Sequence, residues 1–190
     1  MKDVWNNIRK ELSAQALITA ESLNSQADVN EIRELERITE YKLPTSFIDY
    51  LNTFNGQTHN NYEITFIGYN CLLPIREIIE EWKMLVQLFE DEPTIDFIKE
   101  NKVQPKCWDK GWIPFACFEA DTRLVLDMNP GKNGIEGQIL QIWGGQDLES
   151  DEVVITDSFE EFSQKILEEL KSKAFQIEDG VIILNEGWLI

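Results

Sequence analysis

Runs of β-forming residues separated by short turns are the feature that most limits the fold of this chain. The first two runs are separated by Glu119-Ala120-Asp121, a spacing that predicts a β-hairpin. A third run and a short fourth run follow, so we expect an antiparallel meander. The expected strands cover residues 112–118, 122–128, 136–143 and 152–155.

Gly131, Gly134 and Gly137 lie between the second and third runs, at a spacing that a phosphate-binding loop could also have. A P-loop requires the pattern G-x-x-x-x-G-K-S/T at the start of a helix, whereas Gly137 is followed by Gln138 and a strand. Asn129-Pro130, just before the first glycine, adds turn-forming residues. The sequence therefore favours a turn between antiparallel strands over a nucleotide site.

Apolar residues at helical spacing predict helices on both sides of these strands. Two of the helices begin with capping boxes, formed by Asp28 with Glu31 and by Ser158 with Glu161. The expected helices with the clearest limits cover residues 3–13, 28–41, 75–89 and 158–171.

A further helix is expected between the second and the third of these. Leu43-Pro44 stops the helix before it, because the residue before a proline is pushed away from helical geometry. Thr45 or Ser46 can cap the new helix, and Asn55-Gly56 supplies the left-handed residues that commonly end one.

Three other segments complete the chain. Tyr62, Ile64 and Phe66 alternate with polar residues, which predicts a half-buried strand. Residues 90–111 are expected to form an irregular or partly helical connection. Near the end of the chain, Asp179-Gly180 between two apolar runs predicts a second hairpin.

The formal charge is −18, from 35 acidic and 17 basic residues. Such a charge repels nucleic acid and anionic membranes and attracts basic surfaces, so direct nucleic-acid binding is disfavoured. Acidity that only keeps the protein in solution is the alternative interpretation. With 43% hydrophobic residues, the chain can bury a core despite its charge.

The apolar segments and the cysteines favour a cytoplasmic protein. The longest apolar stretches, such as 181–184, are far shorter than the roughly 20 residues that a bilayer crossing needs. The N-terminal region lacks the continuous apolar segment of a secretory signal. Cys71, Cys107 and Cys117 are odd in number and contain no CxxC pair, which suits reduced structural thiols.

Residues able to carry catalysis or bind metal are sparse. His59 is the only histidine, so a metal site with several histidine ligands cannot form. A nucleophile paired with His59 remains formally possible, but no nucleophile motif accompanies it. Glu119 with Asp121 or Asp127 is an acidic pair that could hold a divalent cation or act in acid/base catalysis, but without a second signal the sequence favours solvated surface carboxylates. We therefore predict no catalytic residue, no metal site and no cofactor.

A series of short motifs resembles a known family in order and spacing. The motifs are I-x-x-L-E at 32–36, L-P-x-S-F at 43–47, N-G at 55–56, W-I-P-F-A at 112–116, L-D at 126–127, G-Q-I at 137–139 and D-S-F-E-E-F at 157–162. In this order and spacing, over residues 3–172, the sequence resembles the SUKH superfamily, Smi/Knr type.

The resemblance implies an α+β fold, with a curved, mostly antiparallel sheet and helices packed on it. We expect one domain over residues 1–172 with an insertion at about 90–111, and a β-hairpin appendage of the same domain over 173–190. The family's motif positions are interpreted as turns, caps and core. They are Leu43, Pro44, Asn55, Gly56, Trp112, Pro114, Asp127, Gly134 and Gly137.

The resemblance also implies function, since bacterial members bind and block a toxin domain encoded beside them, often a nuclease. Fungal relatives act as cell-wall regulators and interaction scaffolds. We expect an immunity protein that binds a basic toxin domain through acidic loops, with a non-catalytic scaffold as the alternative. The sequence does not decide whether the protein forms a homo-oligomer. The residues expected to meet the partner are Glu90, Asp91, Glu92, Asp147, Glu149, Asp151 and Glu152.

Overall fold

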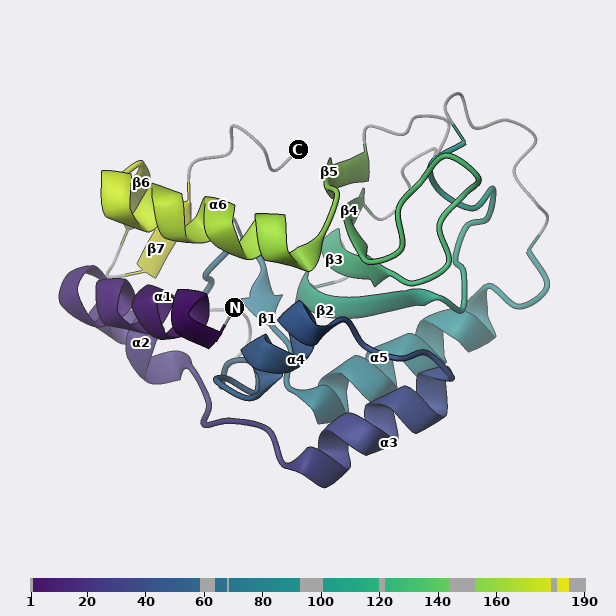
Figure 1. Cartoon of the computed structure of the whole chain (residues 1–190), viewed down its shortest axis with the longest axis horizontal. Helices are drawn as coiled ribbons and strands as arrows, with labels where there is room; N and C mark the ends of the chain where they lie inside the picture. The colour runs from purple at the N-terminus through teal and green to yellow at the C-terminus, as the bar shows by residue number, and fades with distance from the viewer. Residues whose placement is uncertain are drawn as a thin grey trace.

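A computed structural model describes residues 2–58, 64–67, 69–92, 101–119, 122–143, 153–178 and 181–184 (Figure 1). The helices are α1 (Lys2–Gln15), α2 (Leu17–Ser22), α3 (Val29–Thr39), α4 (Thr45–Leu51), α5 (Ile75–Leu88) and α6 (Phe159–Ser172). The strands are β1 (Cys71–Leu72), β2 (Trp112–Phe118), β3 (Thr122–Asp127), β4 (Gln138–Trp143), β5 (Val154–Thr156), β6 (Phe175–Glu178) and β7 (Val181–Leu184).

Strands β1 to β5 form one antiparallel sheet in the order of the chain. Its central hairpin pairs Trp112 with Asp127 at one end and Phe118 with Thr122 at the other. β4 pairs with β3 over its whole length. The meander predicted from the sequence is thus confirmed, and the fold is α+β with helices packed on an antiparallel sheet.

The strand expected over residues 62–66 is wrong in the part that the structure describes. Thr65, Phe66 and Ile67 are buried in succession instead of alternating, and the backbone forms only an isolated bridge between Ile67 and Asn70. The carbonyl of Asn70 accepts hydrogen bonds from both Phe66 and Ile67, so the chain turns tightly here. The first strand of the sheet begins only after this turn, at Cys71.

Helices α3 and α4 differ in whether a side chain caps their first turn. In α3 the capping box is confirmed: the Asp28 carboxylate accepts from the Asn30 amide at 2.7 Å, and Glu31 accepts from the Asp28 amide at 2.9 Å. The cap predicted for α4 is wrong, because Thr45 and Ser46 already belong to the helix and its N-cap is Pro44, which makes no side-chain bond.

The Asn55-Gly56 turn does not end a helix, since α4 stops at Leu51. Gly56 does adopt a left-handed conformation, with φ +66°. A Cβ atom there would lie 2.3 Å from the backbone nitrogen of Pro74, so only glycine allows this close approach. Asn55 accepts a hydrogen bond from the Ile75 amide at 2.8 Å and thereby ties the turn to the start of α5.

The helices pack around the sheet (Figure 1), and aromatic side chains from three helices and one strand meet between them. Trp5 of α1 stacks on Phe159 of α6 at 5.9 Å between ring centroids, and Phe47 of α4 meets the same ring at 4.8 Å. Phe115 of β2 contacts Phe159 edge to face. A second apolar cluster on alternate strand positions includes Trp112 and joins α5 to the segment after residue 101.

The glycine-rich turn joins β3 to β4 and contacts residues 101–103. The Gly131 amide donates to the Lys102 carbonyl at 2.8 Å, and the Asn133 amide donates to the Asn101 carbonyl at 2.9 Å. A Cβ atom at Gly134 would lie 2.0 Å from the Lys102 carbonyl oxygen. The predicted turn between the two strands is confirmed, and both amides donate to backbone carbonyls of the protein itself.

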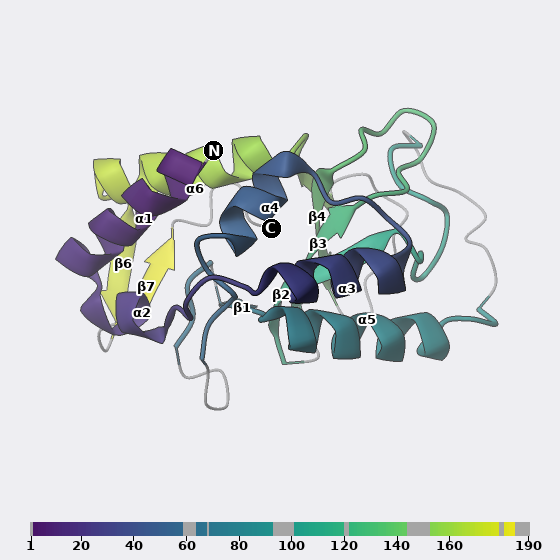
Figure 2. The same ribbon diagram turned by 60° about the horizontal axis from the view of Figure 1, so that its bottom comes forward.

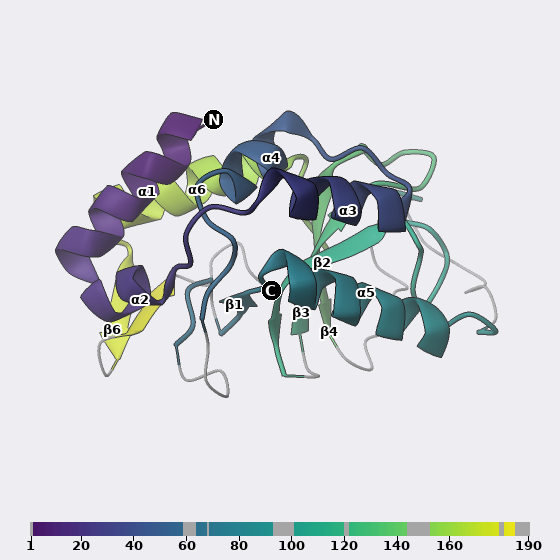
Figure 3. The ribbon, with the colours of Figure 1, turned by 90° about the horizontal axis from the view of Figure 1, so that it is seen from below.

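The C-terminal hairpin predicted from Asp179-Gly180 is present as β6 and β7, which form a separate antiparallel pair. It lies beside α2 and α6 (Figures 2 and 3). The hairpin thus extends the helical side of the molecule and adds nothing to the main sheet.

Candidate functional site

The acidic end of α5 is the first part of the candidate site. Glu90, Asp91 and Glu92 follow the helix directly, and all three are exposed. None of them forms an ion pair with another described residue, and the last turn of α5 contains no basic side chain. Negative charge at a helix C-terminus opposes the helix dipole, so this cluster does not support the helix that it follows.

A groove of about 480 Å³ lies directly beside this acidic end. Helices α3 and α5 run side by side (Figures 2 and 3). Both contribute their C-terminal ends to the groove: Tyr41 lies just beyond α3, and Phe89 is the C-cap of α5. The lining residues are Tyr41, Val86, Phe89, Glu90, Glu92, Lys106, Cys107, Trp108, Asp109, Lys110 and Asn129.

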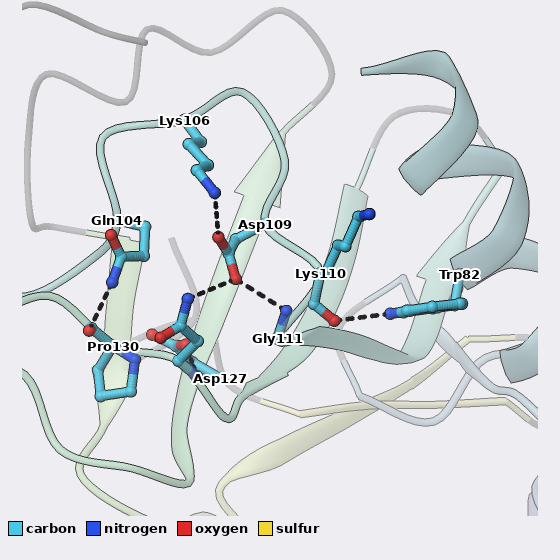
Figure 4. Close-up of polar contacts among 9 residues, drawn as sticks. Trp82, Gln104, Lys106, Asp109, Lys110, Gly111, Asp127 and Pro130 are labelled. Atoms are coloured by element: carbon cyan, nitrogen blue, oxygen red, sulfur yellow. Dashed lines mark hydrogen bonds and ion pairs between the residues drawn. The ribbon is translucent and has the colours of Figure 1, made fainter. Parts of the chain in front are cut away.

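Asp109 fixes the loop that forms the other wall of the groove. Its carboxylate, 2% exposed, accepts hydrogen bonds from the Gly111 amide at 2.8 Å and the Asn129 side chain at 2.9 Å. It also pairs with the ammonium group of Lys106 at 2.8 Å (Figure 4). Three groups from two segments thus meet at one carboxylate, which holds residues 106–111 in place.

Two further hydrogen bonds anchor the same loop. The Trp82 indole of α5 donates to the Lys110 carbonyl at 2.9 Å, and the side-chain amide of Gln104 donates to the Pro130 carbonyl at 2.9 Å (Figure 4). The first bond ties the loop to the helix, and the second ties it to the glycine-rich turn. The groove is therefore bounded by segments that are connected to one another.

Asp127 lies behind this wall, fully buried at the end of β3. Its carboxylate accepts from the Gln138 side chain at 2.7 Å and from the Asn129 amide at 3.0 Å. Burial raises the pKa of Asp127 to about 7, although both hydrogen bonds act in the opposite direction. Burial and the carboxylates of Asp109 and Asp127 also raise the pKa of Tyr41.

The second acidic cluster predicted to meet the partner falls outside the described residues. The structure therefore brings together only Glu90, Asp91 and Glu92 of the expected set. The residues outside the description are Asp147, Glu149, Asp151 and Glu152.

The motif positions expected to be structural are found in the core and at turns. Leu43 and Trp112 are buried, and Pro114 lies in β2 opposite Val125, beside a register shift. Gly137 has φ +87°, and a Cβ atom there would come within 3.4 Å of Pro44 Cγ.

The described residues contain no group of three His, Cys, Asp or Glu side chains placed to hold a metal ion. His59 lies outside the described residues. All three cysteines are free thiols, and burial raises the pKa of Cys71 to about 12. Among the described helices, none is long and apolar enough to cross a membrane.

The sequence alone did not reveal the groove. The sequence places Tyr41 and Phe89 at the ends of two expected helices, and Lys106 and Asp109 in the connection expected over 90–111. The groove forms because three segments distant in sequence meet in space. A usable signal was present in the aromatic residue immediately before the acidic run, Phe89-Glu90-Asp91-Glu92.

Comparison with known proteins assigns the fold to a family. The model of the SMI1 / KNR4 family (SUKH-1) matches residues 26–165, so the chain belongs to this family. A similar curated protein is KNR4/SMI1 homolog 2 of the yeast Debaryomyces hansenii, 32% identical over 83 residues. That alignment covers 44% of this chain and 14% of the yeast protein, so the chain matches only a small part of this relative.

Proposed function

We propose that this protein is an immunity protein of the cytoplasm, which neutralises a toxin domain by binding it at the acidic end of α5. The observation that carries the proposal is the exposed cluster Glu90, Asp91 and Glu92, which lacks an ion-pair partner among the described residues. A carboxylate cluster that opposes its own helix dipole gains most from an external cation.

The proposed partner is a basic toxin domain, and a nuclease fits best. A nuclease binds phosphates in a positively charged cleft, and carboxylates can occupy the same positions. The formal charge of −18 also favours rapid encounter with such a surface. Family membership supports this class of function, because the resemblance implies binding of a protein partner without catalysis.

Growth protection tests the proposal. The neighbouring reading frame that the proposal expects to encode the toxin domain is expressed with the parent, or with the variant E90Q/E92Q. We expect the parent to restore growth and the variant to protect less, because its binding surface has lost two charges. The matched control E21Q/E168Q removes two exposed carboxylates elsewhere and should protect like the parent. Equal protection by both variants would exclude this surface.

A non-catalytic scaffold of the cell-wall-regulator type is the second candidate. The match to a fungal protein named as a KNR4/SMI1 homolog supports it. A scaffold would bind its partner without restoring growth in the presence of a toxin. The growth experiment therefore separates the two candidates.

A further inference from the structure

The ends of two helices give the groove a negative character beyond its carboxylates. α3 ends at Thr39 and α5 at Leu88, and the residues that follow each helix line the groove. The last carbonyls of a helix lack partners within the helix and carry part of the dipole's negative charge. A cation in the groove would thus be close to two helix C-termini as well as to Glu90 and Glu92.

Three aromatic residues, Tyr41, Phe89 and Trp108, line the groove. Tyr41 and Phe89 are only partly buried, so their rings are accessible from the groove. Trp108 is 6% exposed, and its indole N–H has no hydrogen-bond partner among the described residues. Aromatic rings beside carboxylates suit a guanidinium group, which stacks on rings and forms paired hydrogen bonds to carboxylates.

The two lysines that line the groove do not pair with Glu90 and Glu92, the carboxylates at its rim. The ammonium group of Lys106 is held by Asp109 at 2.8 Å, and Figure 4 shows the Lys110 side chain extending away from that pair. Neither lysine forms an ion pair with Glu90 or Glu92 among the described contacts. Both rim carboxylates thus remain available to an incoming cation.

We propose that the groove receives an arginine side chain of a protein partner, with its guanidinium group between Glu90 and Glu92 and against the ring of Phe89. The inference rests on the proposed function, since it names the part of the basic partner that is recognised. An arginine fits better than a polyamine, because alkyl ammonium groups are more strongly hydrated and cannot stack on a ring as a planar group can.

A small arginine peptide tests the groove without the toxin. Capped glycyl-arginyl-glycine is titrated into the protein, and the Gly111 amide and Trp108 indole signals are followed by NMR. We expect saturable shifts with the arginine peptide, and none with the same peptide carrying neutral citrulline. E90Q/E92Q should weaken binding about 3- to 10-fold, while E21Q/E168Q should match the parent.

Cys107 supplies a second measurement, because it is partly exposed and lines the groove, whereas Cys71 and Cys117 are buried. The arginine peptide should slow alkylation of Cys107 by iodoacetamide, and the citrulline peptide should not. Unchanged alkylation together with absent NMR shifts would overturn the inference, as would saturable binding of spermidine alone. If the inference fails while E90Q/E92Q still loses growth protection, only the arginine site is wrong and the proposed function stands.

Discussion

At the scale of single residues, Asp127 combines complete burial with a position beside the candidate site. Its hydrogen bonds from Gln138 and Asn129 join β3, β4 and the glycine-rich turn. Asn129 also contacts Asp109, so the two carboxylates share one neighbour. The residue thus supports the wall of the groove from behind.

Asp127 should make stability depend on pH. An unfolded aspartate titrates near its ordinary value of 3.8, whereas the folded pKa is about 7. The folded state therefore binds more protons between these values, and the free energy of unfolding falls as pH rises through this window. The stabilisation is fully present below the unfolded pKa and is lost above the folded one.

Asp127→Asn removes this titration. Relative to the variant, the parent should lose about 2 to 3 kcal/mol of stability between pH 5 and pH 8. Urea unfolding at several pH values measures the difference, and exposed Asp3→Asn serves as a control that should follow the parent. Parallel pH profiles for parent and Asp127→Asn would show that the buried carboxyl does not titrate in this range.

At the scale of elements, the acidic end of α5 contrasts with the start of α6. Glu160 and Glu161 occupy the first turn of α6, where negative charge is favourable. Glu161 accepts one hydrogen bond from the Asp157 amide at 3.1 Å and pairs with Lys165. Acidic side chains thus stabilise a helix when they lie at its N-terminus and destabilise it when they lie at its C-terminus.

Neutralising the two ends should shift stability in opposite directions. E90Q/D91N/E92Q should raise the free energy of unfolding by about 0.3 to 1 kcal/mol, because it removes repulsion from a helix C-terminus. E160Q/E161Q should lower it by a similar amount. Urea unfolding at low ionic strength measures both variants. A loss of stability in the first variant would mean that its acids have internal partners.

The elements also show what the sequence could and could not predict. Strong local signals succeeded: the capping residues Asp28 and Glu31, and the short turns of the meander. Signals that depend on tertiary contacts failed. In the described part of the strand expected over 62–66, the chain instead enters the tight turn before Asn70, and Gly56 packs closely against Pro74 without ending a helix.

The candidate site divides in the same way. The exposure of acidic residues 90–92 could be predicted, because a run of charged side chains stays in contact with water in a folded protein. Their position beside Tyr41 and the loop held by Asp109 could not, because it depends on how α3 and α5 end at the same place. Periodicity places residues on the face of a helix but does not place one helix end beside another.

At the scale of the whole molecule, net charge and local charge make different contributions to encounter. The formal charge of −18 attracts a basic partner from a distance, but screening limits this attraction to about 8 Å at physiological ionic strength. Charges at the rim of the binding surface act within that range. Two variants with the same net charge can therefore separate the two contributions.

Association with the basic toxin domain, measured by stopped flow at low and high salt, makes that separation. The parent's association rate should fall steeply with salt, since rim charges act chiefly on association. E90Q/E92Q should associate about 3- to 10-fold more slowly at low salt and show a shallower salt dependence, while E21Q/E168Q should stay close to the parent. Equal slowing in both variants would assign the attraction to net charge. No slowing in either would move the binding surface elsewhere, with the cluster at Asp147, Glu149, Asp151 and Glu152 as the next candidate.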